Sequence, residues 1–460
     1  MAKEVKPKLW EAIVILLLML VIMGIGIIEL HLTPVVPILM VILLLIFWGK
    51  LRGFSWDDIN DSFVMGVKNG IIPLFIFLLI GSLIGVWIMA GVIPTLMVYG
   101  FHILSIRWFL PSVFLMCAFV GCFIGSAFTI ISTVGITAMG IGITMGINPA
   151  MIAGAVVSGA VFSDKMSPLS ATTNLASAIA GDDLYHHIKN MMWSTVPAFV
   201  ISLVLFSIIG GNHHAASLTK ITSTSRVLMN NFTISIWMLI PVLLLLICAW
   251  TKIPTIPTLF INILVSIIII LVNPKHHYSF TKIADVMQNG FKINTTNPEI
   301  NQILNRGGIS SMMGTMTLII IALALGGLLI NLGVINVVMD RFSSHIKSTG
   351  MLVLSTVLAA IGVNIFIGEQ YLSIILPGTA FKADYQKAGL APEALGRTLE
   401  DGGAVINYLV PWGVAGVFVA NTLNVPTLHY LPFVFFSLLC PVFSILSGFT
   451  GIGMKRLNQK

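Results

Sequence analysis

The chain has 460 residues, 57% of them apolar, and only 24 Lys or Arg and 17 Asp or Glu side chains carry charge. A soluble globular protein of this length carries roughly 115 charged residues, about a quarter of the total. This deficit leaves too little charge to cover a water-facing surface, so hydrocarbon must surround most of the chain. A soluble enzyme, a secreted disulfide scaffold and a disordered regulator are therefore excluded. Nucleic acid is not an expected partner, because the net charge of +7 comes from basic residues scattered at the ends of apolar segments.

Apolar segments of about 20 residues, the length that crosses a bilayer as a helix, recur along the whole chain. The longest polar interruptions, 211–231, 274–309 and 382–402, leave no room for a separate soluble domain. We therefore predict an all-α, polytopic protein in the lipid bilayer of the cytoplasmic membrane. In chain order, the predicted spans lie near 11–29, 32–49, 70–93, 109–127, 128–146, 149–163, 187–210, 232–250, 254–273, 310–333, 350–367, 403–420 and 428–449.

Basic residues predict which side the amino terminus faces. Lysines precede the first span, Lys6 and Lys8 among them, and Lys50 and Arg52 follow the second. The short segment 29–34 joins these two spans in a tight hairpin, so both basic groups lie on the same side of the membrane. Because cytoplasmic loops carry an excess of Lys and Arg, we expect a cytoplasmic amino terminus.

Two polar segments do not fit ordinary spans. Segments 163–174 and 368–380 carry ionisable groups, yet apolar runs flank each of them without a spacer of loop length. Non-helical backbone at membrane depth is tolerated only where it is buried in protein or lines a wet cavity. We therefore expect broken helices or re-entrant hairpins near 163–181 and 368–381.

The two halves of the chain share four features in the same order. Segment 81–94 matches 324–335, and ahead of each lie an Asp and an Asn, namely Asp61 and Asn69 in the first half and Asp285 and Asn289 in the second. Farther along the chain, 162–164 matches 367–369, and 183–197 matches 393–411. Internal duplication with broken segments at corresponding places is typical of secondary transporters. We predict two membrane repeats, 1–230 and 231–460. Inversion of one repeat is favoured, because alternating access around a central site uses that symmetry, although it places the basic loop 274–309 outside.

Few acidic residues lie at the predicted membrane depth. Asp164 and Glu369 occupy matching places in the two repeats, whereas Glu400 and Asp401 are among the acids predicted in or beside loops. An ionisable group at membrane depth is costly and marks a functional site by default. Both Asp164 and Glu369 are therefore candidate ion or proton sites, with Asp164 the stronger. The alternatives are a structural ion pair between Asp164 and Lys165, and a structural role for Glu369.

Oxygen-bearing side chains gather around Asp164 and at the corresponding place in the second half. Hydroxyl, amide and freed backbone carbonyl oxygens with one carboxylate suit a hard cation such as Na⁺. In the preceding span, Ser126, Thr129 and Thr133 lie three or four residues apart and share a face, although helix packing by small residues is the alternative. With Asp164 as the ligand of a transported Na⁺, the other predicted ion- or substrate-binding residues are Ser163, Ser167, Thr172, Thr173, Asn174, Ser126, Thr129, Thr133, Asn364, Glu369 and Gln370.

The run 163–176, continued by 180–197, resembles the signature of the NhaC-type Na⁺/H⁺ antiporters of the ion transporter superfamily. The likeness extends over essentially the whole chain and includes 121–142 and 368–371. It implies a secondary antiporter that exchanges Na⁺ for H⁺, with both ions competing for Asp164. Neither enzymatic activity nor a cofactor is implied, since Na⁺ and H⁺ are the transported ions.

The same resemblance implies an architecture. Known members of the superfamily have two inverted repeats, each with a re-entrant hairpin, and many are homodimers. By that likeness, the hairpin tips of this chain lie at 171–174 and 377–380.

One position departs from the family pattern. The family usually has Asp where this chain has Ala171, so the site carries one charge fewer. Such a site could also suit a Na⁺- or H⁺-coupled exchanger of a small organic acid, of the malate/lactate type, or of an amino acid, with Lys165 as the partner of an anionic solute. A passive channel and a membrane-embedded enzyme are the hypotheses from other classes. The duplicated broken segments favour a carrier, and no His, Asp or Glu cluster has the spacing of a hydrolase or metal site.

Overall fold

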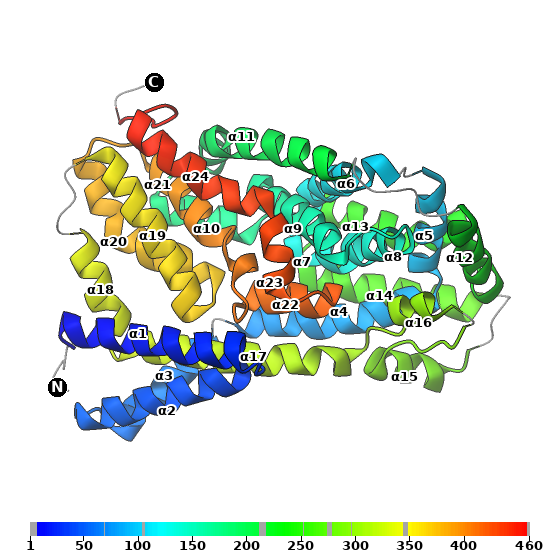
Figure 1. The fold of residues 1–460 in the computed structure, drawn as a ribbon, viewed down its shortest axis with the longest axis horizontal. Helices are drawn as coiled ribbons and strands as arrows, with labels where there is room; N and C mark the ends of the chain where they lie inside the picture. The colour runs from blue at the N-terminus through cyan, green and yellow to red at the C-terminus, as the bar shows by residue number, and fades with distance from the viewer. Residues whose placement is uncertain are drawn as a thin grey trace.

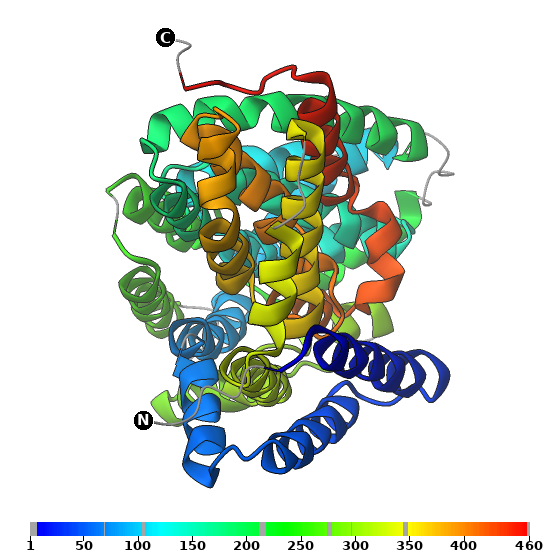
Figure 2. The same cartoon turned by 90° about the vertical axis from the view of Figure 1, so that its left-hand side faces the viewer.

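The computed structural model describes residues 7–68, 70–103, 106–210, 218–251, 253–273, 278–295, 297–343 and 348–457. Asn69, one of the repeat features, lies outside them. The described chain is all-helical apart from one isolated bridge between Leu390 and Arg456. Long helices run side by side along the long axis, and α1 begins and α24 ends at the same end of it (Figure 1). Figure 2, turned by 90°, shows several of these helices end-on.

The helices follow one another with short connections. The first half contains α1 (Leu9–Gly24), α2 (Val35–Leu51), α3 (Trp56–Lys68), α4 (Ile71–Met89), α5 (Val92–Ile103), α6 (Phe109–Ile124), α7 (Ala127–Ile130), α8 (Ile136–Thr144), α9 (Pro149–Met166), α10 (Ala171–Ala180), α11 (Leu184–Gly210) and α12 (Leu218–Asn231). The second half contains α13 (Ile240–Trp250), α14 (Thr255–Val272), α15 (Phe280–Asn289), α16 (Pro298–Leu304), α17 (Ile309–Asn331), α18 (Val334–Ser343), α19 (Thr349–Ile367), α20 (Gln370–Lys387), α21 (Pro392–Leu399), α22 (Val414–Leu423), α23 (Thr427–Tyr430) and α24 (Phe435–Thr450). Three π-helical turns, η1 (Ile25–Glu29), η3 (Ile131–Gly135) and η5 (Glu400–Ala404), and four 3₁₀ turns, η2 (Ile106–Trp108), η4 (Ile236–Leu239), η6 (Asn407–Leu409) and η7 (Leu431–Phe433), complete them.

The predicted polytopic helical fold is confirmed. Among the described residues, seven helices are long and apolar enough to cross a bilayer, and the number rises to ten if each of three bent helix pairs is one span. Every predicted span contains a helix, but 403–420 is interrupted between η6 and α22. The tight hairpin between the first two spans is also present, and an Arg52–Glu11 ion pair ties its two helices together.

Two helices that we call the interfacial helices, α3 and α15, each pack on a span from the other half of the chain. α3 packs on α17, and α15 packs on α4. A Cβ on Gly327 of α17 would collide with the backbone carbonyl of Ser62, and a Cβ on Gly85 of α4 would meet that of Val286. Gly85 and Gly327 both lie six residues before a Gly-Val-Ile sequence, so they hold corresponding positions in the matching segments 81–94 and 324–335. Equivalent glycines therefore admit equivalent helices.

The spans α4 and α17 run antiparallel in direct contact. Gly70 at the start of α4 approaches Leu323, whereas Gly81, farther along α4, approaches Gly308 at the start of α17. A two-fold axis that exchanges two antiparallel spans lies in the membrane plane, which is the relation expected of inverted repeats.

Each half also contains a helical hairpin with a break. α9 and α10 are separated by 167–170, and α19 and α20 by 368–369. The two hairpins contact each other through α10 and α20. The expectation of a second hairpin tip at 377–380 is wrong, because these residues lie inside α20, whose helix continues through Pro377. The second break lies instead at Gly368, which adopts a left-handed conformation.

The prediction of a polar loop over 382–402 is also wrong. Its last part forms α21 and the π-helical turn η5, which pack against α10, α11, α19 and α20. Glu400 and Asp401, predicted in or beside a loop, are completely buried. Gly402 allows this placement, since a Cβ there would lie 2.9 Å from the backbone of Val357.

The glycine contact between α3 and α17 yields a stability prediction. Gly327→Ala should destabilise the protein by about 1–3 kcal/mol, because its methyl group overpacks a backbone contact. Gly314→Ala on the same helix is the matched control, since a Cβ there has nothing within 4 Å. The control should leave stability unchanged or raise it by up to about 1 kcal/mol, the helix-propensity difference. Thermal unfolding in detergent measures both, and equal melting temperatures would contradict the packing described here.

Candidate functional site

A cavity of about 470 Å³ lies where three helix breaks meet. Its polar lining comes from the α9–α10 hairpin, the start of α20 and the α6–α7 break, whereas α4 and the start of α14 supply apolar walls. The lining residues are Asp164, Leu169, Ala171, Thr172, Gln370, Tyr371, Gly125, Ser126, Ala127, Phe128, Ile72, Pro73, Ile76, Phe77, Pro254, Thr255, Ile256 and Pro257.

The break between α9 and α10 is held by its own side chains. The Ser170 hydroxyl accepts the amide N–H of Thr173 at 3.4 Å and so caps α10. The Ser167 hydroxyl donates to the carbonyl of Cys122 at 2.8 Å, and the Asn174 amide donates to the carbonyl of Pro168 at 2.9 Å. These bonds satisfy backbone groups that the break frees. Ser167 and Asn174 therefore shape the hairpin tip.

Asp164 faces the cavity from the last turn of α9. Thr172 on the opposite side of the break donates its hydroxyl to Asp164 Oδ2 at 3.4 Å, and the Ser170 hydroxyl lies 2.9 Å from that of Thr172. The Thr173 hydroxyl donates to the carbonyls of Asp164 and Lys165, both at 3.2 Å. The hairpin thus presents one carboxylate and adjoining hydroxyl oxygens to the cavity.

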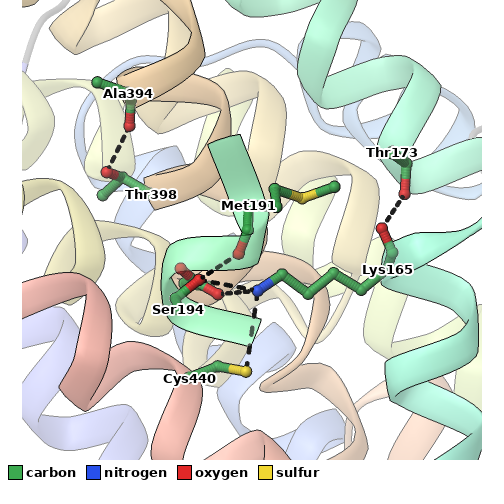
Figure 3. A network of polar contacts seen from close by, with 8 residues as sticks. Lys165, Thr173, Met191, Ser194, Ala394, Thr398 and Cys440 are labelled. Carbon is green, nitrogen blue, oxygen red and sulfur yellow. Dashed lines mark hydrogen bonds and ion pairs between the residues drawn. The ribbon is translucent and has the colours of Figure 1, made fainter. Parts of the chain in front are cut away.

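Lys165 extends away from Asp164 into the interior. Its ammonium pairs with Asp401 of η5 and donates to the Ser194 hydroxyl of α11 at 3.1 Å. Figure 3 shows the Lys165 side chain reaching from α9 towards Ser194 and the Cys440 thiol, whose sulfur lies 3.8 Å from Nζ. The alternative of an Asp164–Lys165 ion pair is therefore wrong, because successive helical residues point in different directions and the lysine is bound elsewhere.

The acids Glu400 and Asp401 were missed by the sequence prediction. The charged groups around the Glu400 carboxylate are Asp164, Lys165 and Asp401, and the Thr173 hydroxyl lies beside it. A signal was present on one side only: two glycines and then an apolar run follow the acids without a spacer of loop length. The polar run 382–402 concealed this pattern.

Glu369 and Asn364 take structural positions in the second half. The Glu369 carboxylate accepts the backbone N–H of Leu372 at 2.8 Å and caps α20 while remaining buried. The Asn364 amide donates to the carbonyl of Gly403 at 2.7 Å and accepts from Asn407 at 2.8 Å, which ties α19 to η5. For Glu369, this geometry favours the structural alternative.

The predicted site residues thus divide into two groups. Asp164, Thr172, Ser126 and Gln370 line the cavity. The remainder surround it: Thr129 and Thr133 bond to the preceding turn of their own helix, and Ser163 donates to the carbonyl of Ala160 at 2.7 Å. The residues outside the described lining are Ser163, Ser167, Thr173, Asn174, Thr129, Thr133, Asn364 and Glu369.

Comparison with known proteins shows which family the chain resembles. The family model described as "Na+/H+ antiporter family" matches residues 159–452, which include the second half of α9, α10, the α19–α20 hairpin and the buried acids of η5. The chain is 44% identical over 424 residues to the Na⁺/H⁺ antiporter NhaC of Alkalihalophilus pseudofirmus, covering 92% of this chain and 91% of the relative. This chain belongs to the Na⁺/H⁺ antiporter family. The family resemblance is confirmed, and a transporter family also agrees with the expectation that the protein is not an enzyme.

Two further family relatives show the range of solutes. The Na⁺/H⁺ antiporter NhaC of Bacillus subtilis is 39% identical over 91% of this chain and 93% of its own length. The malate-2H⁺/Na⁺-lactate antiporter of Bacillus subtilis is 35% identical over 88% of this chain and 86% of its own length. Relatives of similar length in the family therefore carry names for both inorganic and organic exchange.

The buried Lys165–Asp401 pair gives a second prediction. Lys165→Met and Asp401→Asn should each destabilise the protein by about 3–5 kcal/mol, because each leaves an unpaired buried group. The double variant should lose clearly less than the sum of the two, since it removes both charges. The Lys387–Asp384 pair, whose lysine is exposed to solvent, is the control, and its variants Lys387→Met and Asp384→Asn should change stability little. Additive losses at Lys165 and Asp401, measured by chemical unfolding in detergent, would show that the pair is not coupled.

Proposed function

We propose that this chain is a secondary antiporter that exchanges Na⁺ for H⁺ across the cytoplasmic membrane, with Asp164 as the group for which both ions compete. The observation that carries the proposal is the placement of Asp164. Its carboxylate lines the cavity, while the neighbouring Lys165 is neutralised by Asp401. A carboxylate at membrane depth without a fixed cation is favourable only when it holds a proton or a mobile cation.

The other polar groups of the cavity suit a small hard cation. Hydroxyls of Ser126 and Thr172 and the amide of Gln370 add neutral oxygens to the single carboxylate, and hard cations prefer oxygen ligands. One carboxylate matches one monovalent charge, so either Na⁺ or a proton neutralises the site. Two of the relatives, both named Na⁺/H⁺ antiporters, support this assignment.

The topology completes the proposal. Residues 1–230 form the first membrane repeat and 231–460 the second, related by inversion, and the reciprocal contacts of Gly85 and Gly327 support this relation. The amino terminus is cytoplasmic, in keeping with Lys50 and Arg52 at the same end of the first hairpin. Alternating access then moves the two repeats around the cavity. The protein is a homodimer in the lipid bilayer, by the same family likeness.

Exchange of a small organic acid is the second candidate, and two observations bear on it. The malate/lactate relative and the cavity volume of about 470 Å³ favour an organic solute. However, Lys165, the expected partner of an anionic solute, is bound to Asp401 and is not in the described lining of the cavity. The lining offers a carboxylate to the solute, which favours a cation.

Asp164→Asn should abolish exchange while leaving the protein folded, because the amide keeps the shape of the side chain but cannot alternate between a proton and a cation. The measurement is the pH change inside proteoliposomes after a Na⁺ pulse. Asp183→Asn, an exposed residue in the turn before α11, is the control and should retain wild-type rates. Near wild-type exchange by Asp164→Asn would falsify the site. Wild-type flux of malate or lactate without Na⁺-driven pH change would select the second candidate.

Ala171→Asp should make exchange dependent on membrane potential and shift its activity profile to higher pH. Ala171 lines the cavity beside Thr172, so the new carboxylate faces Asp164. Two carboxylates close together resist ionising together, and the added charge must move with the carrier. Exchange rates against pH, with and without a potassium diffusion potential, measure both effects. Ala171→Asn, which has the same shape without the charge, should show neither. An active Ala171→Asp variant that behaves like wild type would place residue 171 away from the ion path.

A further inference from the structure

A line of buried polar side chains connects the protein surface to Lys165 between α11 and α21. On α11 it consists of His187, Asn190 and Ser194, and on α21 and η5 of Glu393, Arg397 and Asp401. Each set is spaced three or four residues apart and so occupies one helix face, and the two helices pack together. All six side chains are less than 9% exposed. We call this set the polar seam.

The inner end of the polar seam lies behind the proposed ion site. Ser194 and Asp401 both bind the Lys165 ammonium, and the adjoining Glu400 carboxylate has Asp164 as well as Lys165 and Asp401 among the charged groups around it. The described lining of the cavity contains none of the six seam residues. The seam therefore reaches the neighbourhood of Asp164 by a path separate from the cavity.

His187 occupies the middle of the polar seam without a hydrogen-bond partner. The ring is completely buried, and neither nitrogen has a partner among the described residues. It sits against Gly396 of α21, where a Cβ would lie 2.6 Å from ring atoms Cε1 and Nδ1. Burying an unpaired polar ring costs free energy, and an apolar side chain would fill the same space without that cost. The site therefore calls for the chemistry of imidazole.

Several charged groups surround this ring. Lys165 of α9 places a positive charge near the ring, and Glu393 of α21 places a negative charge near it. Arg397 of α21 is buried but anchored to the Gly453 carbonyl at 3.0 Å and the Ser447 hydroxyl at 2.8 Å. On α11 itself, Lys189 is exposed at the surface. His187 thus lies between an acid near the surface and the ion pair in the interior.

The outer end of the polar seam is open to water. One side-chain oxygen or nitrogen atom from each of Asp182, His186 and Glu393 lies within 4.8 Å of the other two. Lys455 Nζ lies 2.6 Å from Glu393 Oε1. Burial and then the Glu393 carboxylate raise the pKa of Asp182, which precedes α11, to about 6. Asn190 also lines a surface hollow of about 800 Å³ beside His186 and Lys455. Asp182 can therefore exchange protons with bulk water near neutral pH.

We propose that the polar seam is the proton route of the exchanger: protons pass between Asp182 and Glu393 at the surface and Glu400, the buried acid beside Asp401, through His187, while Na⁺ uses the cavity. Glu400 lies one turn after Gly396, against which the His187 ring packs, and Asp164 is among the charged groups around its carboxylate. The inference rests on the proposed Na⁺/H⁺ exchange. Imidazole suits this role because it accepts a proton at one nitrogen and releases one from the other. A proton leaving Glu393 binds His187, and the opposite nitrogen gives its proton towards the Glu400 carboxylate, which leaves the Lys165–Asp401 pair intact. Rotation of the neutral ring then restores the starting tautomer.

The test compares two transport modes in the same proteoliposomes. Na⁺-driven pH change requires net proton movement, whereas exchange of ²²Na⁺ for Na⁺ at equal pH on both sides requires none. His187→Gln keeps a polar side chain of similar size but cannot carry a proton. It should lower Na⁺-driven pH change at least tenfold and leave ²²Na⁺/Na⁺ exchange within twofold of wild type. Lys189→Gln, which removes a titratable group from the exposed face of the same helix, is the matched control and should change neither.

Two results would overturn the proton route. One is Na⁺-driven pH change within twofold of wild type in His187→Gln. The other is an equal loss of both modes in a protein that elutes as a single folded species, because His187 would then serve packing alone. If His187→Gln fails to fold, Glu393→Gln at the outer end decides: selective loss of proton-coupled exchange supports the route, and unchanged exchange overturns it. Failure of the proposed function itself is seen separately, as wild-type protein that produces no Na⁺-driven pH change.

Discussion

The centre of this transporter depends on the buried ion pair between Lys165 and Asp401. Neither charge could remain at that depth without the other, since an unpaired ion in the protein interior costs several kcal/mol even after relaxation. The pair therefore fixes the α9–α10 hairpin of the first half to the η5 turn of the second. It also holds the basic neighbour of Asp164 elsewhere, as the proposed competition of Na⁺ and H⁺ for that carboxylate requires.

Four glycines, two where helices of the two halves pack together and two beside the buried polar residues, act in the same way. Gly327 and Gly85 let the interfacial helices reach the antiparallel spans, Gly402 lets η5 approach α19, and Gly396 makes room for the His187 ring. In each case a bare Cα allows backbone, or a polar ring, to come closer than a side chain would permit. Polar groups can consequently be placed at membrane depth inside protein, away from lipid.

Much of this arrangement could be predicted from local sequence. Hydropathy locates the spans, and the polar run after α9 places Asp164 and Thr172 together, because both features depend on residues close in the chain. The partner of Lys165 lies 236 residues away and leaves no local signal. Glu400 and Asp401 were assigned to a loop because composition alone does not distinguish a buried polar turn from an exposed one. The family likeness placed a hairpin tip at 377–380, but surrounding helices allow a proline such as Pro377 within a buried helix.

The exchange of interfacial helices between the halves has a consequence for synthesis. α3 is made early, but the glycine face against which it packs belongs to α17, which begins at Ile309. A nascent chain that ends before that residue has its first spans in the bilayer, yet α3 lacks its partner helix. The packing of α3 can therefore be completed only after α17 in the second half has been synthesised. An incomplete chain would carry an amphipathic helix whose glycine-lined partner has not yet been made.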